Sequence, residues 1–168
     1  MEANLAYEKL GLLYLGRELP IGDEEPTGLP LLYKSKNLTT HGVIIGMTGS
    51  GKTGLGIGLI EEAIMDDVPS IIIDPKGDMA NLLLTFPDLK PADFEPWIDP
   101  AEASRKDLSV AQMAEKTAST WSTGLASWGQ SSERIERLRA KSTCTVYTPG
   151  SSAGVPVSIM ASFSAPAE

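Results

Sequence analysis

Apolar residues follow two patterns in the first half of the chain. Short apolar runs at residues 43–45 and 70–73 are typical of strands buried on both faces of a sheet. Between them, from Lys52 onward, apolar side chains recur at helical spacing until Asp66, Asp67 and Pro69 end the pattern. The recurring residues are Leu55, Leu59, Ile60, Ala63 and Ile64. A strand, a helix and a strand within about thirty residues predict a βαβ unit, and therefore an α/β fold with a parallel sheet and a right-handed crossover.

Three glycines, Gly54, Gly56 and Gly58, lie inside the predicted helix. Each costs up to about 1 kcal/mol relative to alanine in a helix interior. Close packing of the helix onto the sheet would account for them.

The segment ahead of this unit has a different pattern. Residues 12–15 and 31–33 are short strand candidates, and residues 20–30 between them are rich in turn-forming and acidic residues. We therefore expect residues 1–40 to form a lead-in built on a β-hairpin, with a short helix at 3–9 as a further possibility. Residues 41–168 form the second unit.

Beyond residue 85 the pattern becomes helical. Residues 86–100 contain four prolines and predict an ordered connector rather than a strand. Ser109 with Gln112 three residues later is a capping-box pattern, which predicts a helix that runs to about Trp128 and ends at Gly129. Ser131 or Ser132 begins a second, charged helix through Lys141. Residues 143–147 are a third strand candidate, closed by Pro149 and Gly150.

The sequence between the first strand and the helix is GMTGSGKTG, residues 46–54. Glycine, four residues and then Gly-Lys-Thr is the pattern of a phosphate-binding P-loop. Glycines let the backbone turn its N–H groups inward around an anion, and the dipole of the following helix favours negative charge there. Lys52 can then reach the β- and γ-phosphates, and the Thr53 hydroxyl can bind Mg²⁺. The predicted phosphate-binding residues are Thr48, Gly49, Ser50, Gly51, Lys52, Thr53 and Gly54.

Asp74 ends the second apolar run and has two functional interpretations. It resembles the metal-binding carboxylate of a Walker B motif, but only one helix separates it from the P-loop, and Pro75 stands where a catalytic glutamate would follow. We favour a site that couples the nucleotide to neighbouring groups, with Lys76 and Asp78 beside it. A plain turn of Pro, Gly and Asp is the structural alternative.

Other notable side chains have structural interpretations. His41, the single histidine, is expected to be a hydrogen-bonded structural residue. The basic residues at 134, 137 and 141 share a helix face that could contact DNA or a partner, but the interleaved glutamates favour a solvated helix. Core packing is expected for Trp97, Trp121 and Trp128. The single cysteine, Cys144, is expected to be a small buried hydrophobe in a reducing compartment, which points to the cytoplasm.

Composition narrows the function classes. The chain has 168 residues, 42% hydrophobic and 21% charged, which is ordinary for a soluble globular protein. Its apolar runs are too short for a membrane span, and its N-terminus is not a signal peptide. The net charge of −8 argues against broad, non-specific nucleic-acid binding by this chain alone, although a small local surface of an assembly could still contact DNA.

The motifs together resemble a known class of enzymes. His41 ahead of a strand, the P-loop at 46–53, Ile73-Asp74-Pro75-Lys76-Gly77-Asp78 and later Tyr147-Thr148-Pro149-Gly150 are similar to the HerA/FtsK class of P-loop ATPases, and most similar to the HerA-like bacterial ATPases. The resemblance covers about residues 30–160. It implies a three-layer RecA-like fold, ATP hydrolysis with Mg²⁺, hexameric rings and translocation or unwinding of double-stranded DNA. Lys52 would be the catalytic lysine, and Thr53 would bind the metal.

One departure from the class limits this expectation. Members have a later strand that ends in Asp-Glu and an arginine supplied by a neighbouring subunit, whereas no apolar run ending in Asp-Glu follows Asp74 here. The chain therefore reads as the N-terminal portion of a longer ATPase, with an incomplete sheet and incomplete catalytic machinery. Two alternatives stay open: a P-loop kinase or phosphotransferase with residues 86–100 as a substrate lid, and a nucleotide-binding regulatory module without turnover.

Overall fold

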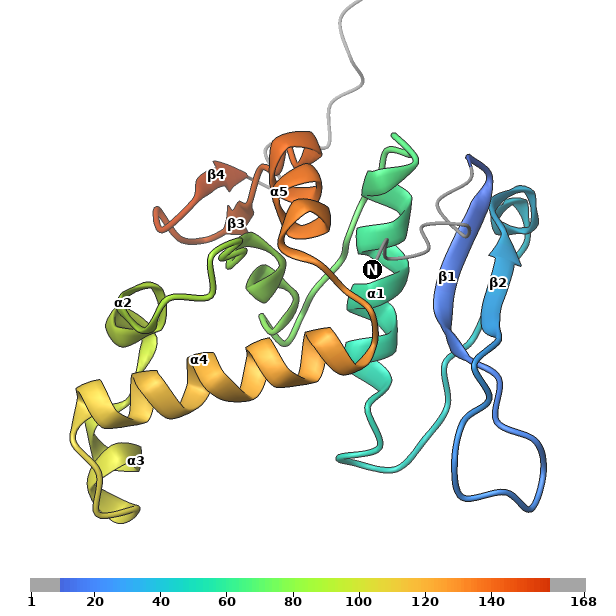
Figure 1. The fold of residues 1–168 in the computed structure, drawn as a ribbon. Helices are drawn as coiled ribbons and strands as arrows, with labels where there is room; N and C mark the ends of the chain where they lie inside the picture. The colour runs from blue at the N-terminus through green and yellow to red at the C-terminus, as the bar shows by residue number, and fades with distance from the viewer. Residues whose placement is uncertain (1–9, 158–168) are drawn as a thin grey trace, which may run out of the picture.

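The chain opens with an antiparallel β-hairpin. The computed structural model describes residues 10–157, so the helix predicted at 3–9 lies outside the described residues. Strand β1 (Leu12–Arg17) pairs with β2 (Pro30–Lys34), with Leu12 opposite Lys34 and an irregularity between Tyr14 and Gly16 (Figure 1). The predicted hairpin is confirmed. A 3-10 turn, η1 (Ser35–Thr39), follows β2.

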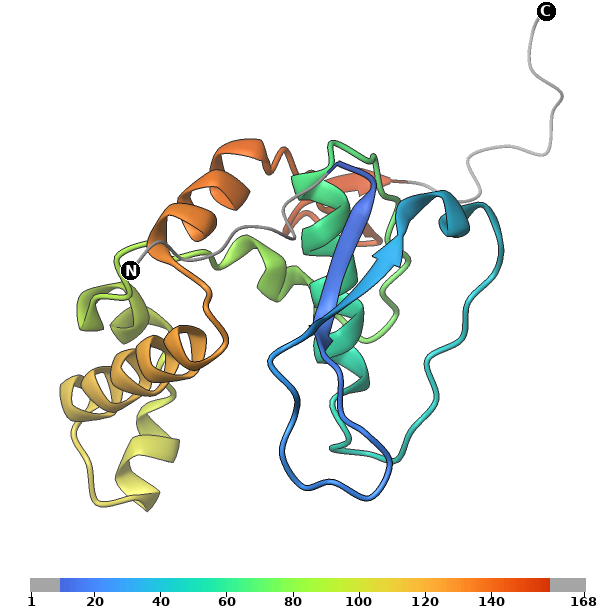
Figure 2. The same ribbon diagram turned by 45° about the vertical axis from the view of Figure 1, so that its right-hand side comes forward.

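Helix α1 (Lys52–Met65) is the central element of the molecule and confirms the helix predicted from the apolar spacing. It packs against β1 on one side and against α5 (Ser132–Lys141) on another (Figures 1 and 2). Leu13 of β1 is fully buried. Ala63 and Met65 of α1 and Leu138 of α5 are almost fully buried. This small core holds the hairpin, α1 and α5 together.

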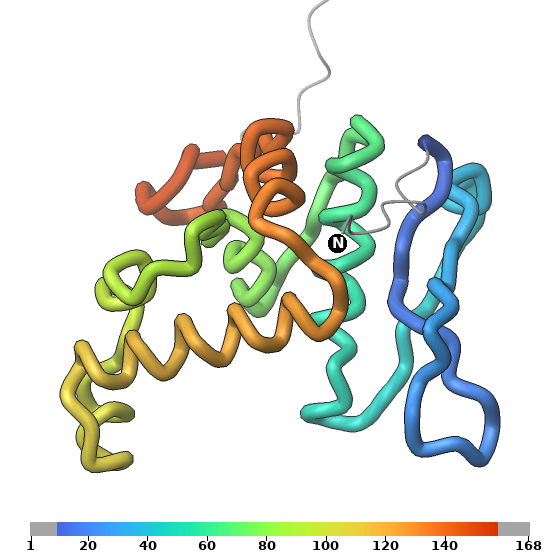
Figure 3. The backbone as a smooth tube through the Cα atoms, in the orientation of Figure 1, coloured from blue at the N-terminus to red at the C-terminus, as the bar shows by residue number. Residues whose placement is uncertain are grey.

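The residues between Asp78 and Gly129 form a helical region. Its elements are η2 (Met79–Leu83), α2 (Pro91–Phe94), η3 (Glu95–Trp97), α3 (Pro100–Arg105) and α4 (Val110–Ser127). Phe94, Ala114 and Ala118 form a separate apolar cluster, against which Phe86, Leu89 and Ile98 pack. The tube in Figure 3 shows α4 reaching away from α1 toward α2 and α3. The proline-rich connector is therefore ordered, as predicted.

The two predicted helix starts beyond residue 105 are confirmed. Ser109 caps α4, because its hydroxyl accepts the Gln112 N–H at 3.2 Å while the Gln112 side chain accepts the Ser109 N–H at 2.9 Å. Gly129 ends this helix with φ of +69°, a left-handed conformation that favours glycine. Ser131 is the N-cap residue of α5.

A second small sheet lies at the C-terminal end of the described chain. Strand β3 (Tyr147–Pro149) pairs in parallel with β4 (Val155–Val157), so the predicted strand at 143–147 begins only at its last residue, and β4 was not predicted. Thr148 stabilises the short connection between the two strands. Its hydroxyl donates to Ser151 O at 2.9 Å and accepts the Gly154 N–H at 3.1 Å. A Cβ on residue 154 would lie 2.5 Å from Val146 O, so only glycine fits there.

The central parallel sheet is not formed by the described residues. Residues 43–45 and 71–73 lie as single traces on either side of α1 in Figure 1, without strand pairing. The prediction that both runs are buried strands is wrong here. Ile71 is 97% exposed, Ile72 41% and Ile73 87%, and all three residues of the first run, at 43–45, are also exposed. The reason is that a strand needs neighbouring N–H and C=O groups, and no part of residues 10–157 offers them to these two segments.

Several side chains expected inside are at the surface. All three tryptophans are exposed. Trp121 and Trp128 lie in the second half and at the end of α4, whose buried residues are in its first half, and Trp97 is the last residue of η3. Cys144 is also exposed, in the unpaired segment ahead of β3, so its interpretation as a buried hydrophobe is wrong. His41 is exposed and makes no hydrogen bond within residues 10–157, which contradicts the expected hydrogen-bonded role.

Within the same described range, every helix is too short or too polar to cross a bilayer.

Candidate nucleotide-binding site

The loop from Gly46 to Gly51 turns tightly into the start of α1. Gly49 and Gly51 have φ of +80° and +85°, a region in which side chains other than glycine are strained. A Cβ on residue 46 would crowd the side chains of Ser50 and Lys52, so a larger residue there would displace both. The Ser50 N–H donates to Met47 O at 3.2 Å and closes the turn. The glycine spacing read from the sequence thus corresponds to a real backbone constraint.

Lys52 is the first residue of α1, and its side chain bends back over the loop. The Nζ atom donates to Gly46 O at 2.7 Å and also to Met47 O. Thr53 follows on the first turn of the helix, while residues 48–51 are exposed. The ammonium group therefore lies against the loop that would hold a phosphate chain.

The loop also carries a set of backbone donors. The N–H groups of Gly49, Gly51, Lys52 and Thr53 make no hydrogen bond to another residue of the described chain. Successive N–H groups at a helix N-terminus, with glycines in left-handed conformation between them, favour an anion such as a phosphate. The donor set and Lys52 together fit a nucleotide triphosphate, and the Thr53 hydroxyl is a ligand suited to its Mg²⁺.

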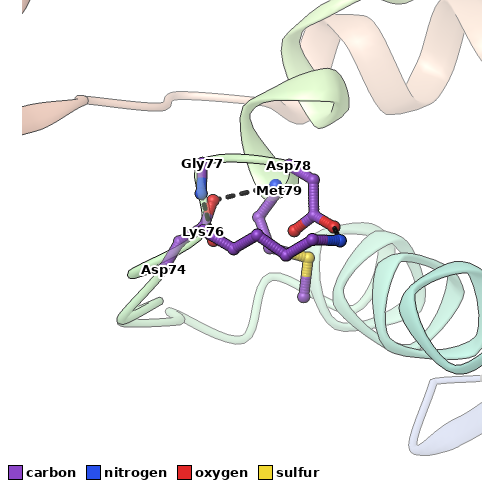
Figure 4. Close-up of polar contacts among 5 residues, drawn as sticks. All are labelled: Asp74, Lys76, Gly77, Asp78 and Met79. Carbon is purple, nitrogen blue, oxygen red and sulfur yellow. Dashed lines mark hydrogen bonds and ion pairs between the residues drawn. The ribbon is translucent and has the colours of Figure 1, made fainter. Parts of the chain in front are cut away.

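Asp74 organises the turn that follows residues 71–73 (Figure 4). Its Oδ1 accepts the Gly77 N–H at 2.8 Å, and its Oδ2 accepts the Met79 N–H at 2.9 Å. These hydrogen bonds, that of Met79 foremost, hold the pKa of the Asp74 carboxyl below its ordinary value. Both oxygens are therefore engaged by backbone donors of the turn.

Lys76 and Asp78 of the same turn form an ion pair. The hydrogen bond that Lys76 Nζ donates to Asp78 raises the pKa of Lys76, whose side chain is largely exposed. Met79 begins η2, which contacts α1. The turn therefore rests against the same helix that begins at the P-loop.

The basic face of α5 differs from its predicted form. Arg134 is buried and pairs with Glu62 of α1, whose other oxygen accepts the Tyr14 N–H of β1 at 2.7 Å. Lys141 Nζ donates to Met65 O and to Asp67, each at 2.7 Å. The prediction of a solvated helix is wrong for Arg134, because that residue joins α5 to α1.

Sequence reasoning missed Glu62, although a signal was present. Glu62 lies three residues after Leu59, on the apolar side of the predicted helix, where a charged residue needs a partner. Its neighbour Glu61 has a pKa raised first by burial and further by Glu62, while Arg134 acts in the opposite direction. A charged cluster therefore lies between α1 and α5.

A family model described as "Helicase HerA, central domain" matches residues 19–141. No curated protein and no solved structure matches this chain. The match spans the P-loop, the Asp74 turn, the helical region and α5, which is most of the chain. The chain therefore belongs to the HerA helicase central-domain family, a family of P-loop ATPases.

Proposed function

We propose that this chain is the ATP-binding part of a HerA-like motor ATPase that couples ATP hydrolysis to the translocation or unwinding of double-stranded DNA. The observation that carries the proposal is the loop at residues 46–53, where glycines, free backbone donors and Lys52 converge at the N-terminus of α1. Membership in the HerA family supports the motor ATPase class.

In this proposal each loop residue has a defined role. The backbone of residues 48–54 surrounds the phosphates, and Lys52 leaves the carbonyls of Gly46 and Met47 to pair with the β- and γ-phosphate oxygens. Thr53 provides a hydroxyl ligand to Mg²⁺, which neutralises charge between these phosphates when bound. Asp74, Lys76 and Asp78 form a coupling site at the end of residues 71–73.

The larger architecture is part of the same proposal. Residues 43–45 and 71–73 would be strands of a RecA-like parallel sheet in the complete ATPase domain, of which residues 41–168 form the N-terminal part. Their Val and Ile content supports this. Neither segment has a strand partner within residues 10–157, so the backbone of each is open to pairing with further strands. A hexameric ring around double-stranded DNA, in the cytoplasm, would be the working assembly.

Calorimetric titration with Mg-ATP tests the site. The variant Lys52→Ala should bind Mg-ATP at least several-fold more weakly than the parent, because the backbone donors cannot replace a cation. Lys116→Ala is the matched control, since Lys116 is an exposed lysine on α4 and should leave the affinity unchanged. Equal affinity in parent and Lys52→Ala would contradict the proposed site.

A further inference from the structure

The three glycines of α1 have different surroundings. A Cβ on Gly56 would lie 3.4 Å from the terminal methyl carbon of Met79. A Cβ on Gly54 or Gly58 would meet no atom within 4 Å among the described residues. Of the three, only Gly56 packs against another side chain here, and its partner belongs to the Asp74 turn rather than to a sheet.

Gly56 also lies on the same face of the helix as Lys52. Residues four apart in an α-helix are neighbours on one face, so Gly56 lies directly beyond Lys52. Met79 therefore contacts the P-loop helix one turn after its phosphate-binding lysine. The absence of a side chain at residue 56 lets Met79 rest on the helix backbone itself.

Met79 is held from its other end by Asp74. The Met79 N–H donates to Asp74 Oδ2 at 2.9 Å, and Gly77 N–H donates to Oδ1 at 2.8 Å. Figure 4 shows the Met79 side chain extending from this turn toward α1, with Asp74 on the far side. One packing contact and two hydrogen bonds thus connect the face of Lys52 to the Asp74 carboxylate.

We propose that the Gly56–Met79 contact positions the Asp74 turn relative to Lys52, so that a shift of α1 when nucleotide binds is transmitted to Asp74. Gly56 and Met79 are positioning residues in this inference, which rests on the proposed ATP-binding function. The terminal methyl group of Met79 lies where it would be at van der Waals distance from a Cβ on residue 56. A displacement of the helix toward Met79 would therefore press on this side chain and, through it, on the turn.

The chain offers a matched pair of variants. Gly56→Val places a branched side chain against Met79 and displaces it, whereas Gly58→Val makes the same change on the same helix in open space. The change in helix propensity is the same in both and cancels in the comparison. Met79→Ala removes the contact without altering α1, and Gly56→Val with Met79→Ala restores room for the turn.

The experiment measures two properties of the backbone amides of Gly77 and residue 79 in the full chain: their hydrogen-exchange rates and their NMR chemical shifts. Both are measured with and without Mg-ATP. We expect Mg-ATP to shift these signals in the parent and in Gly58→Val. In Gly56→Val both amides should exchange at least about fivefold faster, and the nucleotide-induced shift should be lost while ATP affinity is kept. The double variant should recover the slow exchange of Gly77.

The outcomes separate this inference from the proposed function. Failure of the parent to bind Mg-ATP would overturn both, whereas ATP binding with equal exchange and shifts in Gly56→Val and Gly58→Val would overturn the positioning role alone. If Gly56→Val does not fold, Met79→Ala decides: unchanged Gly77 exchange and an unchanged nucleotide-induced shift would overturn the inference.

Discussion

Glu61 is a carboxylate whose surroundings favour its neutral form. Burial raises its pKa above the ordinary value of about 4.3. Arg134 opposes this effect, and the adjacent Glu62 adds to it by less than Arg134 takes away. The folded protein therefore holds this proton more tightly than the unfolded chain does. As the pH rises above about 4.3, this group lowers the free energy of unfolding.

Replacing Glu61 with glutamine should consequently stabilise the protein at neutral pH. We expect Glu61→Gln to raise the melting temperature at pH 7 by about 1–3 °C, and to have little effect near pH 3, where the parent carboxyl is largely protonated in both states. Thermal unfolding at the two pH values measures this. Glu133→Gln is the control and should lower the melting temperature at pH 7, because a hydrogen bond from Ser131 lowers the pKa of Glu133 and stabilises its charged form. A destabilised Glu61→Gln at pH 7 would contradict the argument.

At the scale of elements, one buried ion pair joins α1 to α5. The side chains of Arg134 and Glu62 are each 9% exposed, and the pair also meets the backbone of β1 through Tyr14. Arg134→Met should lower the free energy of unfolding by about 3–5 kcal/mol, because it leaves Glu62 buried without its cation. Lys106→Met breaks a half-exposed pair between Glu102 of α3 and the residue that follows this helix, and should cost only about 0.3–0.5 kcal/mol. Urea unfolding of both variants tests this, and similar losses would contradict it.

The start of α4 allows a second prediction at this scale. Ser109→Ala removes the hydroxyl that accepts the Gln112 N–H, and should cost about 1 kcal/mol. Ser119→Ala is the control, because Ser119 is exposed in the middle of the same helix, where alanine is favoured by up to about 0.5 kcal/mol. Urea unfolding of the two variants should therefore give shifts of opposite sign. A Ser109→Ala protein as stable as the parent would show that the cap does not contribute.

These elements show which parts of the fold and the site could be predicted from the sequence. The P-loop, the hairpin and the cap of α4 depend on residues within a few positions of one another, so their spacing in the sequence already contains the geometry. The Glu62–Arg134 pair joins residues 72 positions apart, and no local pattern specifies such a partner. The same holds for Met79 on Gly56, and for the tryptophans, whose exposure depends on which helices surround α4.

At the scale of the whole molecule, the apolar segments beside α1 are the most unusual surface. The outward residues at 71 and 73 are almost fully exposed, while Ile72 between them is less so, and residues 43–45 repeat the alternation. This is the pattern of strands with one face inward and with unpaired backbone edges. Unpaired edges of this kind favour association with further β-strands. The candidate phosphate-binding loop at 46–53 and the Asp74 turn each follow one of these segments directly.

The last prediction concerns the activity of the whole chain. We expect this chain to bind Mg-ATP but to hydrolyse it very slowly. Binding needs the loop donors, Lys52 and Thr53, which α1 and the glycines place together. Turnover also needs a carboxylate that orients the attacking water, and both oxygens of Asp74 are engaged by the N–H groups of its own turn. It needs a cation that stabilises the transition state, for which an arginine finger alone contributes about 10³- to 10⁵-fold in P-loop enzymes.

Steady-state phosphate release by the purified chain, with Lys52→Ala to correct for contaminating ATPases, measures this turnover. We expect parent and variant to release phosphate at the same low rate, although only the parent should bind Mg-ATP tightly by calorimetry. Fast turnover by the parent that disappears in Lys52→Ala would contradict the prediction. It would mean that Asp74 leaves the Gly77 and Met79 amides during the reaction and serves as the metal-binding carboxylate that its position after the Ile-Ile-Ile run first indicated.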